Sequence, residues 1–352
     1  MMQTSGSILF VARDPERPSF RYRIAPAIEV LRQRGMRCRV ELFPQTRYGR
    51  RLWDLRASLR EASAVVIVKI QVAPPEAWWL RRLAGHLALD IDDAIYVRKP
   101  RGPLADPDDS WWRRAKFRAT CRSMDLIIAG NRHLAEAVKP YGARVEIVPT
   151  PIDCERYQQS APDPARPPRM LWIGQPENLI YLEVLKPVIA RLQACWPELK
   201  LRVVCSRFPD WDESMLERVT WSSESEVRAL ASADVGVMPL SDNEWTRGKC
   251  AFKLLQYMAA GLPCVAAPVG ANREVVTHDY NGFLATTEAD WYESLRRLFA
   301  SPELRATFGM RGLARVRSDY NIPGAASRTA ELIAGLASSG VVSLPADAGS
   351  VS

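Results

Sequence analysis

Histidine is scarce in this sequence, and several familiar catalytic motifs are missing from it. Only His86, His133 and His278 occur in 352 residues. The chain has no H-E-x-x-H, G-x-S-x-G or G-x-G-x-x-G motif, so zinc proteases, α/β-hydrolases and common dinucleotide-binding enzymes lack their local signals. A Walker A loop is also missing, because Cys250 stands where the magnesium-binding hydroxyl belongs. A P-loop nucleotide hydrolase is therefore disfavoured.

Signals for export, membrane insertion and cysteine cross-linking are also lacking. The seven cysteines are scattered and never form a C-x-x-C pair, which argues against a zinc site or a disulfide framework and for a reducing compartment. The N-terminus has no basic region before an apolar run, so we expect no secretory signal. One uncharged stretch, residues 254–272, contains two glycines and two prolines, which favours a helix, a turn and a buried strand over a membrane span. We expect a cytoplasmic protein.

Charge is distributed unevenly along the chain. Residues 1–150 carry 27 Lys and Arg against 16 Asp and Glu, whereas the remainder carries 21 against 24. This asymmetry indicates that the first half faces an anionic phospholipid surface, a phosphorylated substrate or nucleic acid, although isolated basic side chains usually lie on a solvated face. Two clusters stand out: Arg47, Arg50, Arg51, Arg56 and Arg60, then Trp111, Trp112, Arg113, Arg114, Lys116 and Arg118.

Paired tryptophans among cations in the second cluster suit the headgroup layer of a bilayer. We therefore expect contact with the inner face of an anionic membrane. The chain shows no stacking-aromatic motif of a nucleic-acid-binding fold, so we expect no nucleic-acid partner.

Short apolar runs rich in β-branched residues alternate with helical patterns, first over residues 1–150 and again after residue 169. This alternation predicts an α/β protein with two parallel sheets and a cleft in which ligands bind at the carboxyl ends of the strands. The segment APDPARPP holds four prolines and predicts a linker. The predicted organisation is an N-terminal acceptor-side domain (1–160), the linker (161–168), a C-terminal domain (169–319), a C-terminal helix (320–336) and a disordered tail (337–352).

The segment after the strand predicted over 235–239 is the strongest candidate for an anion site. A polar loop leads into a helix predicted from about Cys250, and a helix N-terminus attracts anions. Gly248 would let a ligand approach the backbone closely. Lys249 and Lys253 are four residues apart, hence on one helix face, and with Arg247 they could neutralise a diphosphate. The alternative for either lysine alone is a solvated basic helix start.

Residues 252–285 (FKLLQYMAAGLPCVAAPVGANREVVTHDYNGFLA) predict a helix, a tight turn, an apolar strand, a glycine loop and an Asn-Gly turn. Here the chain resembles the nucleotide-sugar-binding domain of GT-B glycosyltransferases of the family-4 (group 1) type. The resemblance continues through LRATFGMRGLARVRSDY, residues 304–320. It implies two Rossmann-like domains that close over a nucleotide-diphosphate sugar, with no metal or other cofactor required.

The family's E-x7-E motif is not matched. Its two positions, for the sugar hydroxyls and the ribose, fall on Gly248 and Gln256 in this sequence. Gln256 could still hydrogen-bond a ribose through its amide, and Glu244, Asp242 or backbone amides could replace the other carboxylate. The resemblance also implies donor-side roles for Gly174, Gln175 and Glu274. Since Gly174 and Gln175 stand where the family has an arginine, phosphate neutralisation is expected from Arg247, Lys249 and Lys253.

The N-terminal half resembles the family more loosely. The segment PSFRYR, residues 18–23, stands where family members have a glycine-rich loop, and there Arg21 and Arg23 are expected to reach a phosphate or to be plain surface arginines. At the end of a predicted strand, Asp92 or Asp93 could orient or deprotonate an acceptor hydroxyl, bind a cation, or simply cap a helix.

The leading hypothesis is a retaining glycosyltransferase that moves a sugar from a nucleotide-diphosphate donor to a hydroxyl of a glycan or lipid-linked acceptor. The missing glutamates motivate the alternative, a glycosyltransferase-like binding or scaffold protein without activity.

Overall fold

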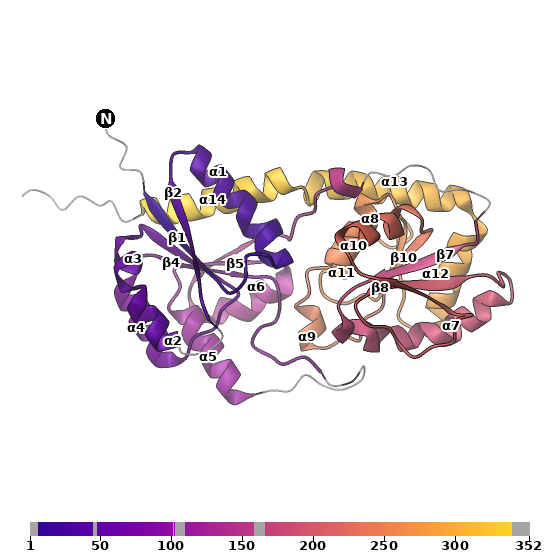
Figure 1. Ribbon diagram of the computed structural model, residues 1–352, viewed down its shortest axis with the longest axis horizontal. Coiled ribbons are helices and arrows are strands. Elements are labelled where there is room, and N and C mark those ends of the chain that lie inside the picture. Colours follow the sequence, from indigo (N-terminus) through magenta and orange to yellow (C-terminus); the bar gives the residue numbers. More distant parts are fainter. Residues whose placement is uncertain (1–5, 45–47, 101, 103–109, 158–165, 340–352) are drawn as a thin grey trace, which may run out of the picture.

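The chain folds into two β/α domains that lie side by side (Figure 1). This structure is a computed structural model and describes residues 6–44, 48–100, 102, 110–157 and 166–339. Within those residues the strands form two six-stranded sheets, and every strand pair is parallel. The predicted architecture of two Rossmann-like domains is confirmed.

The N-terminal sheet has helices on both faces. Its strands, in spatial order, are β2 (Arg37–Leu42), β1 (Ser7–Ala12), β3 (Ala64–Val68), β4 (Leu87–Ile91), β5 (Leu126–Ala129) and β6 (Arg144–Ile147). One face shares a core with α2 (Tyr48–Asp54), α3 (Arg56–Glu61), α4 (Pro74–Leu83), α5 (Trp111–Arg122) and α6 (Arg132–Val138). The other face packs against the π-helix η1 (Phe20–Ile24), α1 (Ala25–Gln33) and α14 (Ile322–Ser338).

The C-terminal sheet repeats this plan. Its strands, in spatial order, are β12 (Phe283–Leu284), β11 (Cys264–Ala266), β10 (Val235–Met238), β7 (Arg169–Ile173), β8 (Lys200–Cys205) and β9 (Leu216–Thr220). One core includes residues of α8 (Ser223–Ala231), α10 (Phe252–Ala259), α11 (Asn272–Val275) and α13 (Pro302–Asp319). The opposite core includes the 3-10 helix η4 (Pro176–Val184), α7 (Leu185–Gln193) and α12 (Glu288–Ala300).

The last helix returns to the first domain. After α13 ends in the C-terminal domain, α14 packs on α1 and η1 (Figure 1, yellow). Ile152 N donates to Tyr320 O at 2.8 Å where the chain crosses between the domains, and Arg328 pairs with Glu146 at 2.9 Å. The predicted C-terminal helix is therefore present two residues later than expected. It includes residues 337 and 338, which the sequence assigned to the tail.

Other boundaries also differ from the predictions. The helical segment from Pro176 to Gln193 is divided into η4 and α7, because Pro187 lacks a backbone N–H and is tolerated only in the first turn of a helix. Strand β9 escaped prediction because it is an edge strand with an exposed, weakly apolar face. Residues 161–165 of the expected linker and 340–352 of the expected tail lie outside the described residues.

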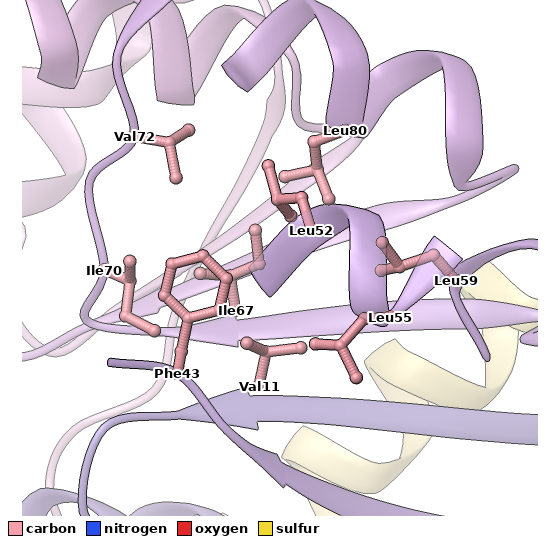
Figure 2. A pocket seen from close by; sticks show the side chains of 9 residues that line it. All are labelled: Val11, Phe43, Leu52, Leu55, Leu59, Ile67, Ile70, Val72 and Leu80. Carbon is pink, nitrogen blue, oxygen red and sulfur yellow. The ribbon is translucent and has the colours of Figure 1, made fainter. Parts of the chain in front are cut away.

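A small gap remains in the core of the N-terminal domain. Apolar side chains from β1, β3 and helices α2 to α4 surround it (Figure 2). Its volume is about 10 Å³, which is room for one water at most, and no polar atom is present to hold that water. It is therefore a packing gap rather than a ligand site. The lining residues are Val11, Phe43, Leu52, Leu55, Leu59, Ile67, Ile70, Val72 and Leu80.

Candidate active site at the domain interface

The segment between β10 and α10 lies against the opposite domain. Its first part is the short helix α9 (Glu244–Arg247), which Asn243 caps by accepting a hydrogen bond from Thr246 N at 3.0 Å. Helix α10 begins at Phe252, two residues after the predicted start, because Ala251 has a φ of 53°. That left-handed backbone is unfavourable for alanine and interrupts a helix. The prediction that Lys249 lies on the helix with Lys253 is therefore wrong.

The N-terminal domain holds this segment in place. Asn131 Nδ2 donates to Lys249 O at 3.0 Å and to Arg247 O at 3.3 Å. Cys250 Sγ lies 3.2 Å from Asp92 O. A Cβ on Gly248 would lie 2.5 Å from Ala94 Cβ. In this structure, the group that approaches the backbone of Gly248 closely is therefore Ala94 of the opposing domain.

Lys253 and Lys249 stay close together at this interface, although they belong to different local structures. Both side chains are half-buried, and Lys253 crosses the face of Gly174, where a Cβ would lie 2.7 Å from Lys253 Cε. Burial and the charge of Lys249 lower the pKa of Lys253 to about 7. Burial also lowers the pKa of Lys249, whereas Asp93 opposes that shift.

Neither lysine forms an ion pair with a carboxylate in the described part of the chain; each instead lies over a tryptophan. Lys253 Nζ is 5.3 Å from the ring centre of Trp172, and Lys249 Nζ is 5.3 Å from that of Trp245. Two neighbouring ammonium groups, partly desolvated, repel each other unless an anion lies between or beside them. This arrangement is suited to binding a polyanion such as a diphosphate.

Opposite the lysines, a carboxylate pair lies at the carboxyl end of β4. Lys69 forms ion pairs with Asp93 and, at 2.9 Å, with Asp92. Burial alone would lower the pKa of Lys69, but the two aspartates outweigh it and raise that pKa. Burial would likewise raise the pKa of Asp92, but Lys69 and Arg23 lower it. Asp92 is therefore held in the charged form at neutral pH.

The two arginines near the N-terminus have different environments. The side chain of Arg23 is 2% exposed and bonds Asp90 Oδ1 at 2.6 Å and Val148 O at 2.7 Å. It also bonds the hydroxyl of Thr150, so its guanidinium is committed to the domain core rather than to a phosphate. Arg21 is exposed and lies over the ring of Tyr22 at 5.7 Å.

Gln256 and Glu244 are each engaged with other side chains. Gln256 is buried, and its Nε2 donates to Tyr157 Oη at 3.2 Å. Glu244 crosses the domain interface: it accepts from Tyr96 Oη at 2.8 Å and lies 3.2 Å from His133 Nε2. Glu244 is thus a contact between the domains in this structure.

The remaining donor-side candidates are more peripheral. Arg247 is exposed and pairs with Asp242 at 2.7 Å. Gln175 is exposed at the start of η4, and Glu274 is half-buried on α11, which packs beside α10. The structure therefore brings together Lys249, Lys253 and Gly174 with Asp92 and Asp93.

A comparison of the sequence with models of protein families finds a match. Residues 167–301 match the family model described as glycosyl transferases group 1. This match covers 135 of the 352 residues and lies in the C-terminal domain. No curated protein matches the chain.

Solved structures share the fold of this chain along almost its whole length. The structure of Alr3699/HepE from Anabaena, in complex with UDP and glucose, matches with 16% identity and a TM-score of 0.69, covering 94% of this chain and 100% of that chain. Sucrose-phosphate synthase from Thermosynechococcus elongatus matches with 14% identity and a TM-score of 0.70, covering 94% and 99%. A glycosyltransferase from Rickettsia africae matches with 10% identity and a TM-score of 0.68, covering 95% and 99%. The fold is GT-B, as expected.

The C-terminal domain also has a cavity. Its volume is about 610 Å³, and it opens where β10, β11 and β12 end, which is where open α/β sheets bind ligands. Among the residues that line this cavity, only Asp242 was a candidate site residue from the sequence. The cavity is lined by Ile180, Tyr181, Glu183, Val184, Pro239, Leu240, Ser241, Asp242, Asn243, Ala267, Pro268, Val269, Arg273, Ala285, Thr286 and Trp291.

Two residues that organise the interface were missed from the sequence. Lys69 pairs with Asp92 and Asp93, which follow it by 23 and 24 residues in the sequence. Asn131 donates hydrogen bonds to two backbone carbonyls that are 116 and 118 residues further along the chain. An Asn after a strand resembles an ordinary helix cap, and Asn131 does cap α6 by accepting from Leu134 N at 2.8 Å. No local pattern indicated its second role. Among the described residues, no group of three His, Cys, Asp or Glu side chains is arranged to hold a metal ion.

Proposed function

We propose that this protein is a glycosyltransferase that transfers a sugar from a nucleoside diphosphate sugar to an acceptor hydroxyl, with the donor diphosphate bound by Lys249 and Lys253. The observation that carries the proposal is the pair of half-buried ammonium groups at the domain interface, which have no carboxylate partner among the residues that the structure describes. The HepE structures contain UDP and UDP-glucose, which makes UDP-sugars the first donors to test.

The chemistry follows from where charge develops. As the glycosidic bond to the diphosphate breaks, negative charge grows on the leaving oxygen, and fixed cations nearby lower the barrier. Lys249 and Lys253 supply those cations from this chain, and the nucleotide-diphosphate sugar is the only small molecule that the proposal requires. We propose retention of the anomeric configuration, on the ground of the resemblance to the family-4 type.

We assign binding of the acceptor to the N-terminal domain. Asp92 and Asp93 lie at the end of β4 and pair with Lys69, and a carboxylate oxygen of Asp93 can accept a hydrogen bond from an acceptor hydroxyl and orient it. The acceptor that we propose is a glycan or a lipid-linked glycan at the cytoplasmic face of a membrane. Arg21, which is exposed, remains a candidate for an acceptor phosphate.

A binding or scaffold protein without activity is the second candidate. It is favoured by one observation: the positions of the two family glutamates are Gly248, packed against Ala94, and Gln256, bonded to Tyr157. In that case the protein would bind the nucleotide sugar and release no nucleotide.

Two measurements on the same preparations separate these candidates. A thermal-shift panel with UDP, GDP, ADP, dTDP and their sugars reports binding, because a ligand that binds only the folded state raises the melting temperature. A nucleotide-release assay with a panel of glycan and lipid-linked acceptors reports transfer. Binding with turnover supports the transferase, and binding without turnover supports the scaffold. If no nucleotide shifts the melting temperature, or if Lys253→Met retains the full shift, the diphosphate site is wrong.

A further inference from the structure

Four large aromatic side chains are exposed on one side of the N-terminal domain. Trp53 on α2 is 54% exposed, Trp78 on α4 is 61% exposed, and Trp111 and Trp112 on α5 are 76% and 42% exposed. The buried sides of these helices share a single core on one face of the sheet, and α4 packs beside both α2 and α5. We call the outer side of α2 to α5 the tryptophan face. Soluble surfaces seldom carry so much clustered aromatic area unless something covers it.

The tryptophan face is strongly basic. Arg56 lies 4.5 Å from the ring centre of Trp53, Arg82 lies 4.6 Å from that of Trp78, and Lys116 lies 5.6 Å from that of Trp112. Within these four helices the exposed acidic residues are Asp54 and Glu61. The exposed basic residues of the same helices are Arg50, Arg56, Arg60, Arg81, Arg82, Arg114, Arg118 and Arg122.

We propose that the tryptophan face docks on the surface of an anionic phospholipid bilayer. Tryptophan rings are favoured at the level of the lipid headgroups, because one part of the ring is apolar and the indole N–H is polar. Arginines beside them pair with lipid phosphates, and their attraction to an anionic leaflet adds up over the cluster. The structure describes no helix long and apolar enough to cross a membrane, so this contact is one that lies on the bilayer.

The face adjoins the proposed acceptor side of the cleft. Arg113 Nη1, in the first turn of α5, donates to Ile95 O at 3.1 Å. Tyr96, which follows Ile95 in the sequence, donates a hydrogen bond to Glu244 across the domain interface. A bilayer against the start of α5 would therefore lie beside the cleft, where a lipid-linked acceptor can enter. This inference rests on the proposed function for the acceptor only, because lipid docking itself needs no transfer.

A second copy of the chain fits the tryptophan face less well. Two identical basic faces brought together would place like charges opposite each other, which is unfavourable. Negatively charged headgroups instead complement the excess of arginine. Charge complementarity thus selects the bilayer as the occupant.

Vesicle co-sedimentation of the full chain tests the proposal without donor or acceptor. We expect binding to phosphatidylcholine vesicles that contain phosphatidylglycerol, loss of that binding at high salt, and little binding to phosphatidylcholine alone. The double variant Arg118→Glu/Arg122→Glu should weaken the partition coefficient by about tenfold or more, because each basic residue at an anionic surface contributes about fivefold. Trp111→Ala/Trp112→Ala should weaken it as well and reduce quenching of tryptophan fluorescence by brominated lipid.

Matched controls lie on the other domain. Met310→Ser removes an exposed apolar side chain from α13, and Arg296→Glu reverses a surface charge on α12; both should bind vesicles as the parent does. Equal binding of the tryptophan-face and control variants overturns the proposal, as does equal binding to neutral and anionic vesicles. A dimer that dissociates in the Trp111/Trp112 variant, without vesicle binding, also overturns it in favour of self-association. UDP thermal shifts on the same variants report the donor site separately, so a failure of docking is not mistaken for a failure of the diphosphate site.

Discussion

The two domains have the same sheet and layer plan, yet they treat buried charge in opposite ways. In the N-terminal domain Arg23 is paired with Asp90, and Lys69 with Asp92 and Asp93. In the C-terminal domain Lys249 and Lys253 reach the same interface with no carboxylate partner in the described residues. Paired buried charges hold a structure together, whereas desolvated cations without a counter-ion store electrostatic free energy that an anionic ligand can release.

Breaking the pair in the N-terminal domain should have the largest effect of all. Arg23→Met leaves Asp90 buried without its cation, and such a loss costs about 3–5 kcal/mol of the free energy of unfolding. Urea denaturation checks the change. As a matched control, Arg34→Met removes an exposed partner of Glu331 and should cost less than about 1 kcal/mol. Similar costs for both variants would remove the contrast between buried and surface pairs.

Removing an unpaired cation from the C-terminal domain should affect chemistry rather than stability. Lys253→Met is expected to reduce kcat/KM by about 10² or more, because a fixed charge near the leaving oxygens is lost. The melting temperature should hold or rise, since a desolvated ammonium disappears. Lys186→Met, on the exposed side of α7, serves as the control with unchanged kinetics. Near-parental turnover of Lys253→Met would exclude this residue from the mechanism.

The contact that joins the two domains should have an intermediate effect. Asn131→Asp keeps an oxygen to cap α6, but it replaces the donor to Arg247 O and Lys249 O with a carboxylate. We expect kcat/KM to decrease about tenfold, which corresponds to the loss of one or two hydrogen bonds, and the melting temperature to decrease as well, because a buried carboxylate then faces two carbonyl oxygens. Steady-state kinetics measures the effect on kcat/KM, and calorimetry measures the effect on the melting temperature. A large loss of stability with unchanged kinetics per folded molecule would make Asn131 merely a cap.

The smallest expected effect is a dependence of UDP affinity on pH. The pKa of Lys253 is lowered to about 7, so the side chain is charged below this pH and loses its charge above it. UDP affinity should therefore decrease about threefold to tenfold between about pH 6.5 and pH 8. Binding above neutrality should also take up a proton, because the diphosphate raises the pKa of Lys253. Isothermal titration calorimetry in two buffers of different ionisation enthalpy measures the UDP affinity and the proton uptake. Lys253→Met should make the UDP affinity nearly independent of pH in this range.

Local pattern was sufficient for the architecture and for the segment that carries the site. Alternating strands and helices predict two parallel sheets, and the residues from 252 onward resemble the group 1 family. Both signals are local, because burying a strand or a helix face imposes a period of two or 3.6 on the residues nearest to it in the chain.

The charge partners were decided by tertiary structure. Sequence alone could not distinguish Arg23, buried on Asp90, from Arg21, exposed two residues earlier. Nor could it show that Asn131 bonds carbonyls more than 100 positions away, or that Ala251 interrupts the expected helix. The charge, burial and backbone strain of a residue depend on which distant segments fold against it. Those contacts follow from the packing of two whole domains rather than from any window of sequence.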